Sequence, residues 1–139
     1  MPAKTFVDFG TVYSKTGPTN SGAGLTNNTY VAGSQFGAGL CEQVSVSLLL
    51  TLSGATGYTV KLQGSIDGTT WNDLQSTDNS AGTTAIEHSY TSSTLNDVLQ
   101  TANCAGMSCG VRVSVKATGG ATASGDTAVF KATGFQVAA

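Results

Sequence analysis

The sequence predicts an all-β fold, a single β-sandwich of the jelly-roll or immunoglobulin-like type with about seven to eight strands and at most one short helix. Three observations support this prediction. Apolar and polar residues alternate with a period of two in several segments, which is the pattern of a strand with one buried face. Glycine-rich connections separate these segments. The 139 residues suffice for one hydrophobic core, so residues 1–139 are expected to form one domain.

The strongest strand patterns place an apolar residue at every second position. They cover residues 44–52, 58–66 and 111–116. In the second of these, Gly64 occupies an inward position between Leu62 and Ile66. One face of each segment is apolar and the other is polar, so each is expected to lie in a sheet that has one face on the core.

Weaker strand patterns run through residues 5–14, 30–31, 71–74, 84–91 and 127–137. In the last of these, Phe130 and Phe135 are an odd number of residues apart, so a regular strand would place them on opposite faces. The pairing of the strand must therefore slip by one residue to bring both onto the core face. Gly134 lies where a β-bulge would produce that slip. A similar slip at Gly10 would bring the apolar residues of the first segment onto one face.

A short helical turn is expected from Thr94 to Leu99. Thr94 and Asp97 have the spacing of a capping box, in which two side chains bond to free backbone amides at the start of a helix. Leu95, Val98 and Leu99 would then face the core together, because residues three and four apart are neighbours on a helix.

Residues 15–39 form a long segment that is poor in apolar residues and rich in Gly, Ser, Thr and Asn. Connections of this length are uncommon in compact domains and are either mobile or functional. The isolated aromatic residues Tyr30 and Phe36 are the candidate anchors for a binding partner, since aromatic side chains dominate many protein interfaces. The alternative is that the two rings pin the segment onto its own core.

The sharpest local motif is the turn Ser65-Ile66-Asp67-Gly68-Thr69-Thr70-Trp71. Asp67 and Gly68 tolerate positive φ angles, so they are expected to turn the chain between two strands of a hairpin. Trp71 would then return a large ring against the sheet and close one end of the core. The functional alternative is an exposed tryptophan that stacks on a sugar.

Charged residues make up only 10% of the chain, and the net charge is −2. Six scattered basic residues do not form the Lys/Arg stripe that phosphate neutralisation requires, so nucleic acid is not an expected partner. No apolar run reaches the length of a signal peptide or of a membrane span. We therefore expect synthesis in a reducing cytosol and no contact with a membrane.

Residues that could carry chemistry lie in no recognised arrangement. The other candidate ligands for a metal at Cys104 and Cys109 are the distant Cys41 and the single His88. These four residues lack the short spacing of a zinc ligand set. Small buried thiols are expected, with a bridge from Cys104 to Cys41 or to Cys109 as the alternative. His88 has no nucleophile in a known setting. We expect no enzymatic activity, no metal, no cofactor and no small-molecule substrate.

The segment from Tyr58 to Leu74, which contains the Asp-Gly turn and Trp71, resembles a pattern common in small β-sandwich proteins of tailed-bacteriophage virions. It is also similar to a Ser-x-Asp-Gly-x-x-Trp turn of discoidin-like carbohydrate-binding domains. This match covers a small part of the chain and is specific for a hairpin. Together with the sparse charge and the hydroxyl-rich composition, the chain resembles a phage head decoration, or cement, protein.

The resemblance implies a virion structural protein that is made in the host cytoplasm without a signal peptide and lies on the capsid surface. Its partners would be the major capsid protein and copies of itself, as a trimer, and it would tie neighbouring capsomers together. The segment 15–39 or the N-terminal strand would add backbone hydrogen bonds by joining a neighbour's sheet edge. The alternatives are a carbohydrate-binding or adhesion module of a tail or fibre, and a head–tail connector or tail component.

Overall fold

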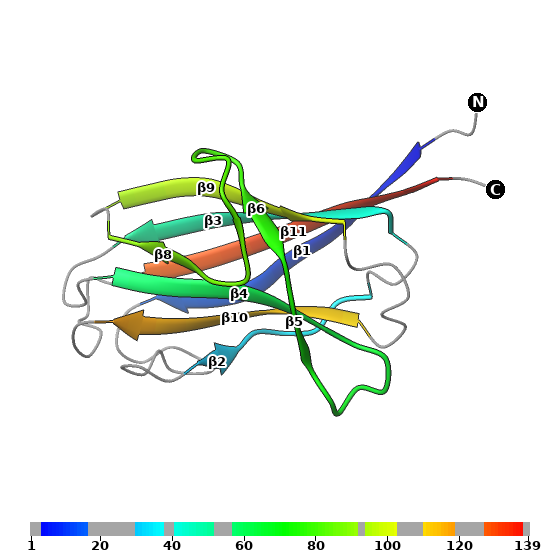
Figure 1. Cartoon of the computed structure of the whole chain (residues 1–139), viewed down its shortest axis with the longest axis horizontal. Helices are drawn as coiled ribbons and strands as arrows, with labels where there is room; N and C mark the ends of the chain where they lie inside the picture. The colour runs from blue at the N-terminus through cyan, green and yellow to red at the C-terminus, as the bar shows by residue number, and fades with distance from the viewer. Residues whose placement is uncertain are drawn as a thin grey trace.

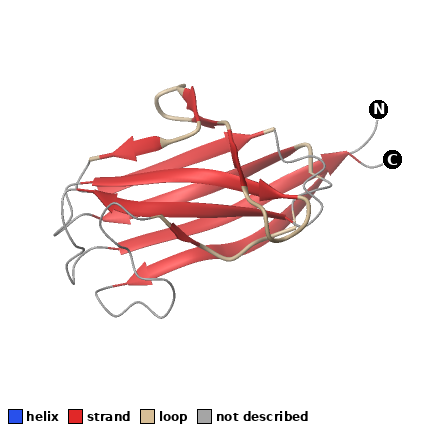
Figure 2. Cartoon of the chain, turned by 60° about the horizontal axis from the view of Figure 1, so that its bottom comes forward, coloured by secondary structure: helices blue, strands red, loops and turns tan. Residues whose placement is uncertain are grey.

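The computed structural model describes residues 4–16, 30–37, 41–51, 57–91, 94–102, 110–118 and 127–137. Within these ranges every regular element is a strand, and the strands form two antiparallel sheets packed face to face (Figure 1; Figure 2). The predicted all-β sandwich is therefore confirmed. The same ranges contain no helix that is long and apolar enough to cross a membrane. The predicted polar segment 15–39 falls within them only at residues 15–16 and 30–37.

The larger sheet has six strands in the order β1-β11-β3-β9-β6-β7. In that order their bounds are Lys4–Thr16, Thr127–Val137, Gln43–Thr51, Thr94–Thr101, Ser76–Asp78 and Thr84–Ala85. The smaller sheet has the order β2-β10-β4-β5, and β8 also pairs with β4. The bounds of β2, β10, β4, β5 and β8 are Val31–Ala32, Gly110–Thr118, Gly57–Ser65, Asn72–Leu74 and His88–Tyr90.

The described residues thus contain eleven strands, more than the sequence predicts. The difference arises because five of the strands have only two or three residues. Segments this short are below the length at which a period of two is readable in a sequence. The predicted strand 84–91, for example, is divided into β7 and β8, which belong to different sheets.

The core lies between the sheets and is formed by the inward faces of the longest strands. Burial alternates strictly along β3, as its period of two predicts. The inward residues of β3, β4, β10 and β11 are at most 1% exposed: Val44, Val46, Leu48, Leu50, Tyr58, Val60, Leu62, Val111, Val113, Val115, Ala128, Phe130 and Ala132. Full burial of a large apolar side chain contributes about 1.5–3 kcal/mol relative to exposure, so this layer is the main source of stability.

The segment that follows β2 closes one side of the sandwich by contacting both sheets. Gly33 donates its amide to the Val113 carbonyl of β10 (2.8 Å), and Phe36 exchanges two backbone hydrogen bonds with Val111 (2.8 Å each). A Cβ atom on Gly33 would overlap the Val12 carbonyl of β1, so glycine allows the close approach of the two backbones.

On another side, the chain changes sheets as it passes from β5 to β6 (Figure 1). β5 pairs with β4 in the smaller sheet, and β6 pairs with β9 in the larger one. β8 then returns to β4. His88 of β8 is buried, and its Nε2 atom lies 3.0 Å from the Ser76 hydroxyl and 3.1 Å from the Ser76 carbonyl of β6. This histidine therefore ties the two sheets together at the crossing.

The β-bulge predicted at Gly10 is confirmed. The register of β1 against β11 shifts between Asp8 and Gly10, and Gly10 has a φ of 69°. A second shift, which the sequence did not indicate, lies between Thr11 and Tyr13. The two irregularities allow both Val12 and Tyr13 to be buried although they are neighbours.

The β-bulge predicted at Gly134 is wrong, because β11 keeps a continuous register through this residue against both neighbouring strands. Phe135 therefore points to the outer face, where its ring meets that of Phe6 at a centroid distance of 5.8 Å. Gly134 occupies the inner face, where an added Cβ would lie 2.9 Å from the Cys41 sulfur. Lack of space beside Cys41, not a change of parity, accounts for glycine here.

The helical turn predicted from Thr94 to Leu99 is also wrong, because these residues lie in β9, which pairs with β3. Asp97 and Leu99 occupy inward positions, whereas Asn96 is exposed and Val98 is half-buried. An acidic residue at an inward position conceals the period of two. The spacing of Leu95, Val98 and Leu99 therefore resembles that of one face of a helix.

Candidate functional site

Of the two predicted anchors, Phe36 lies in the core. Its buried ring contacts Phe9 at a centroid distance of 4.9 Å, so it holds its segment on the domain and offers no surface to a partner. Tyr30 is half-buried on the outer face of the smaller sheet. Its ring centroid lies 4.2 Å from Lys61 Nζ of β4 and 4.8 Å from Lys116 Nζ of β10. A partner that binds the outer face of this sheet can therefore reach Tyr30 and the two lysines beside it.

The turn around Asp67 joins β4 to β5, which pair with each other. Asp67 Oδ1 accepts hydrogen bonds from the Thr69 amide (2.8 Å), the Thr70 amide (2.7 Å) and the Ser65 hydroxyl (3.1 Å). Gly68 has a φ of 80° and donates its amide to Ser65 Oγ (2.8 Å). One carboxylate therefore organises the whole turn.

Trp71 does not close the core, in contrast to the expectation from the sequence. It is half-buried, and the Arg112 guanidinium of β10 lies over its ring at 4.2 Å from the centroid. Arg112 alternates with the fully buried Val111 and Val113, so the pair lies on the outer face of the smaller sheet. A contact of this kind contributes roughly 0.5–1 kcal/mol where water still has access.

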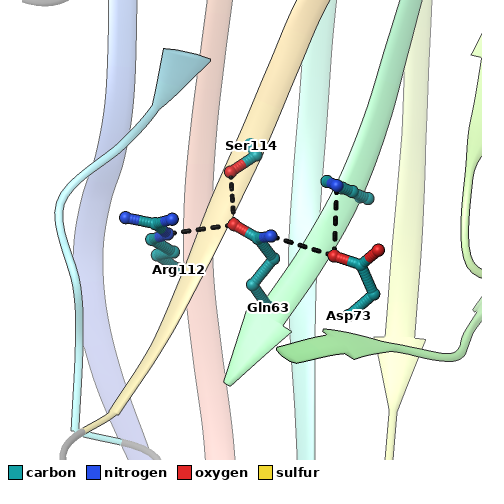
Figure 3. Close-up of polar contacts among 5 residues, drawn as sticks. Gln63, Asp73, Arg112 and Ser114 are labelled. Atoms are coloured by element: carbon teal, nitrogen blue, oxygen red, sulfur yellow. Dashed lines mark hydrogen bonds and ion pairs between the residues drawn. The ribbon is translucent and has the colours of Figure 1, made fainter. Parts of the chain in front are cut away.

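Gln63 of β4 connects Arg112 and Ser114 of β10 with Asp73 of β5 (Figure 3). Its Oε1 accepts hydrogen bonds from Arg112 Nε (3.0 Å) and Ser114 Oγ (2.9 Å). Its Nε2 donates to Asp73 Oδ1 of β5 (2.9 Å), which also pairs with Lys61 Nζ at 3.1 Å. Three hydrogen bonds and one ion pair thus run across three strands and fix the orientation of Arg112, Asp73 and Lys61.

We call this set of side chains the outer basic face: Tyr30, Lys61, Gln63, Trp71, Asp73, Arg112, Ser114 and Lys116. It contains three of the six Lys and Arg residues of a chain whose net charge is −2. Asp73, and Glu87 beside Tyr30, offset two of these three positive charges. The face therefore keeps a small positive excess on an acidic chain, which favours a partner of opposite charge.

The network shifts the protonation equilibria of its members. The hydrogen bond from Gln63, helped by Lys61, holds the pKa of Asp73 below its usual range although burial opposes this. Burial, together with the neighbouring carboxylate of Glu87, raises the pKa of Tyr30. Burial also lowers the pKa of Arg112, whose ordinary value is so high that the guanidinium stays charged.

Sequence reasoning missed Gln63 and Arg112, which looked like ordinary outward positions of two alternating strands. The register places them directly opposite each other, with Lys61 opposite Ser114 two residues along β4. The available signal was the polar face of two of the three strongest predicted strands, where the long side chains of Lys61, Gln63, Arg112 and Lys116 stand among Ser and Thr residues. Only the pairing of β4 with β10 brings these side chains together.

Other residues considered from the sequence do not join this face. His88 is engaged by Ser76, and Cys41 is buried, which raises the pKa of its thiol. Cys104 and Cys109 lie outside the described residues, so the predicted alternatives for their bridges are not tested.

The Asp67 turn gives a prediction about pH. Backbone hydrogen bonds from Thr70 and Thr69 hold the pKa of Asp67 well below its ordinary value. Because the pKa is depressed in the folded state, the carboxylate stabilises the turn at pH values above the pKa of the unfolded state. This contribution is lost as the pH falls through the lower pKa of the folded state. NMR titration of the Asp67 carboxyl carbon and of the two threonine amides is expected to show one shared midpoint well below an ordinary aspartate. A midpoint near 3.9 would contradict the assigned hydrogen bonds.

These features define a two-sheet, all-β protein with a polar, pre-ordered face on one sheet. Two solved structures of similar fold come from prophages. The SPBc2 prophage-derived protein YomS has 15% sequence identity and a TM-score of 0.52, and the match covers 98% of this chain and 96% of YomS. The PBSX exported protein XepA has 12% identity and a TM-score of 0.54, over 98% of this chain and 39% of XepA.

At these identities the similarity shows a shared fold. The chain spans almost all of YomS but well under half of XepA. No protein-family model matches the sequence, and no curated protein matches it significantly.

Proposed function

We propose that this chain is a non-enzymatic structural protein of a phage virion, which decorates the capsid shell and stabilises it by binding across neighbouring capsomers. The outer basic face is the observation that carries the proposal. Similarity of fold to two prophage-derived proteins supports the phage context, and the near-complete coverage of YomS supports a protein that works as one domain.

The outer basic face suits binding because its side chains are already ordered. Gln63 fixes Arg112 and Asp73 before any partner arrives, so little side-chain entropy remains to be lost on association. Arginine and aromatic residues are the types most often found at the energetic centre of interfaces. The partner that fits is a protein surface rich in carboxylates and carbonyl groups, presented repeatedly by the major capsid protein or by copies of this chain.

Binding to purified capsids that lack the protein tests this proposal. Co-sedimentation of the added chain is expected to saturate at a copy number on the order of hundreds per particle, as a symmetric shell requires. Arg112→Ala is expected to weaken binding roughly tenfold or more, since it removes a charged group from the centre of the face. Lys131→Ala is the matched control, because Lys131 is an exposed cation on the larger sheet. Equal binding by both variants would contradict a role for the outer basic face.

A second candidate is a role outside the particle, which one observation favours: XepA is described as an exported protein. Absence of the chain from purified particles, with its presence in the medium after lysis, would favour this candidate. About a dozen copies per particle would indicate a connector or tail component instead. A carbohydrate-binding module is less well supported, because Arg112 covers one face of the Trp71 ring.

A further inference from the structure

The edges of the two sheets differ greatly in length. In the described ranges, the smaller sheet ends in β2 on one side and in β5 and β8 on the other, and one edge of the larger sheet is β7. Each of these strands has two or three residues. The other edge of the larger sheet is β1, which has 13 residues. A long edge strand offers a row of backbone hydrogen-bonding groups to another strand, whereas very short edges do not.

Only the first part of β1 is suited to such pairing. The second part contains the two shifts of register against β11, and the Ser34 amide donates to the Val12 carbonyl there (2.9 Å). The residues from Lys4 to Asp8, in contrast, keep a continuous register against β11, and no other described strand pairs with them. We call residues 4–8 the open edge.

The open edge belongs to a ribbon that projects from the sandwich. β1 and β11 run beyond the other strands toward the two ends of the chain (Figure 1). The pairing of β3 with β11 stops where Gln43 meets Phe135, so among the described strands Gln136 and Val137 pair with β1 alone. Two strands without a third are only marginally stable in water. A further strand on the open edge would therefore stabilise the ribbon.

The sequence of the open edge is complementary to itself. If two copies pair antiparallel about a two-fold axis at Phe6, position 4 of one copy is opposite position 8 of the other. These positions are occupied by Lys4 and Asp8, so each copy brings a positive residue opposite a negative one. Opposite charges at directly facing positions stabilise an antiparallel pair, and like charges destabilise it. The charge pattern therefore favours a second copy of this chain as the added strand.

The same pairing covers an exposed aromatic ring. Phe6 is 78% exposed, the most exposed of the large apolar side chains that the structure describes. It would lie directly opposite Phe6 of the second copy, with the two Cβ atoms about 4.5–5.5 Å apart. Each Phe6 ring already meets Phe135 edge to face, so the pairing would form a row of four rings across the joined sheets. Aromatic pairs of this kind are favourable in addition to the apolar area that they bury.

We propose that the open edge is a two-fold contact between copies of this chain, in which two β1 strands pair antiparallel about Phe6 and join two larger sheets into one. Five residues from each copy form a contact much smaller than a standard interface of about 1,600 Å², so the dimer is weak in free solution. It forms readily where copies are held side by side at mM effective concentrations. The contact is independent of the outer basic face, which lies on the other sheet.

Sedimentation equilibrium of the isolated chain over a range of concentrations tests the contact. The apparent mass is expected to rise with concentration toward that of a dimer. Lys4→Asp is expected to weaken the dimer roughly tenfold or more, because like charges then face each other twice. Adding Asp8→Lys to Lys4→Asp is expected to restore the dimer, since opposite charges face each other again in reversed order. Lys131→Asp is the matched control: it makes the same change of charge at an exposed position of β11 and is expected to leave the dimer unchanged.

A second measurement uses the unaltered chain and therefore does not depend on the folding of a variant. In NMR spectra recorded on dilution, the amides of residues 4–8 are expected to shift together along one monomer–dimer curve, while those of Gln63 and Arg112 stay in place. A chain that remains a monomer up to about 1 mM, the effective concentration of copies held side by side, would overturn the proposal. So would a trimer, or dilution shifts that lie outside the open edge. None of these outcomes would affect the proposed binding to a capsid through the outer basic face.

Discussion

Replacing Phe130 by alanine is expected to lower the free energy of unfolding by about 3–5 kcal/mol, the range for truncation of a buried aromatic residue. Phe130 is 0% exposed on the inward face of β11, between β1 and β3 in the larger sheet. Its ring stacks on Tyr13 at a centroid distance of 5.2 Å. Loss of the ring would remove this contact and leave a cavity that the surrounding strands fill only in part, because all of them are held by long ladders of hydrogen bonds.

Phe6→Ala is the matched control for this prediction. Phe6 is 78% exposed near the start of β1, and its described ring contact is the edge-to-face pair with Phe135. Its truncation is expected to cost at most about 1 kcal/mol. Urea unfolding followed by tryptophan fluorescence measures both variants, since the chain has one Trp. Equal losses for the two would show that the layer around Phe130 is not the main source of stability.

The strands that could be predicted from the sequence are those in which one face is uniformly apolar. β3, β4 and β10 satisfy this condition, and all three were located within a few residues. β9 does not, because Asp97 occupies an inward position next to Leu99. The Ser80 and Val98 amides donate to Asp97 Oδ1 and hold this acidic residue at its inward position, and the local sequence pattern does not show these contacts.

The outer basic face could not be predicted for a different reason. Apart from Tyr30 and Trp71, its members are unremarkable in sequence, and they meet only because β10 pairs with β4 and the chain returns through β5. Local sequence patterns do not reveal how two strands that are distant in sequence align with each other. The predicted bulge at Gly134 failed in a related way, because the need for space beside Cys41 is a property of the packed structure.

Gly110→Ala is expected to lower the free energy of unfolding by about 2–4 kcal/mol, because backbone strain of about 1–3 kcal/mol adds to a steric clash. Gly110 has a φ of 121°, a region that side chains disfavour, and an added Cβ would lie 2.7 Å from the Phe36 carbonyl oxygen. That carbonyl accepts the Val111 amide, so the backbone bridge that closes this side of the sandwich would have to move.

Gly82→Ala separates the two contributions to the Gly110 effect. Gly82 also has a positive φ of 70°, but an added Cβ would meet nothing within 4 Å, so only the strain of roughly 1 kcal/mol is expected. Denaturant unfolding gives both values. Because the bridge at Phe36 anchors the segment that carries Tyr30, Gly110→Ala should also disturb the NMR signals of Lys61 and Lys116, whereas Gly82→Ala should not. Equal destabilisation by the two substitutions would mean that backbone strain alone acts and that the Phe36–Val111 hydrogen bonds shift at little cost. The outer basic face would then be less rigid than its hydrogen bonds indicate.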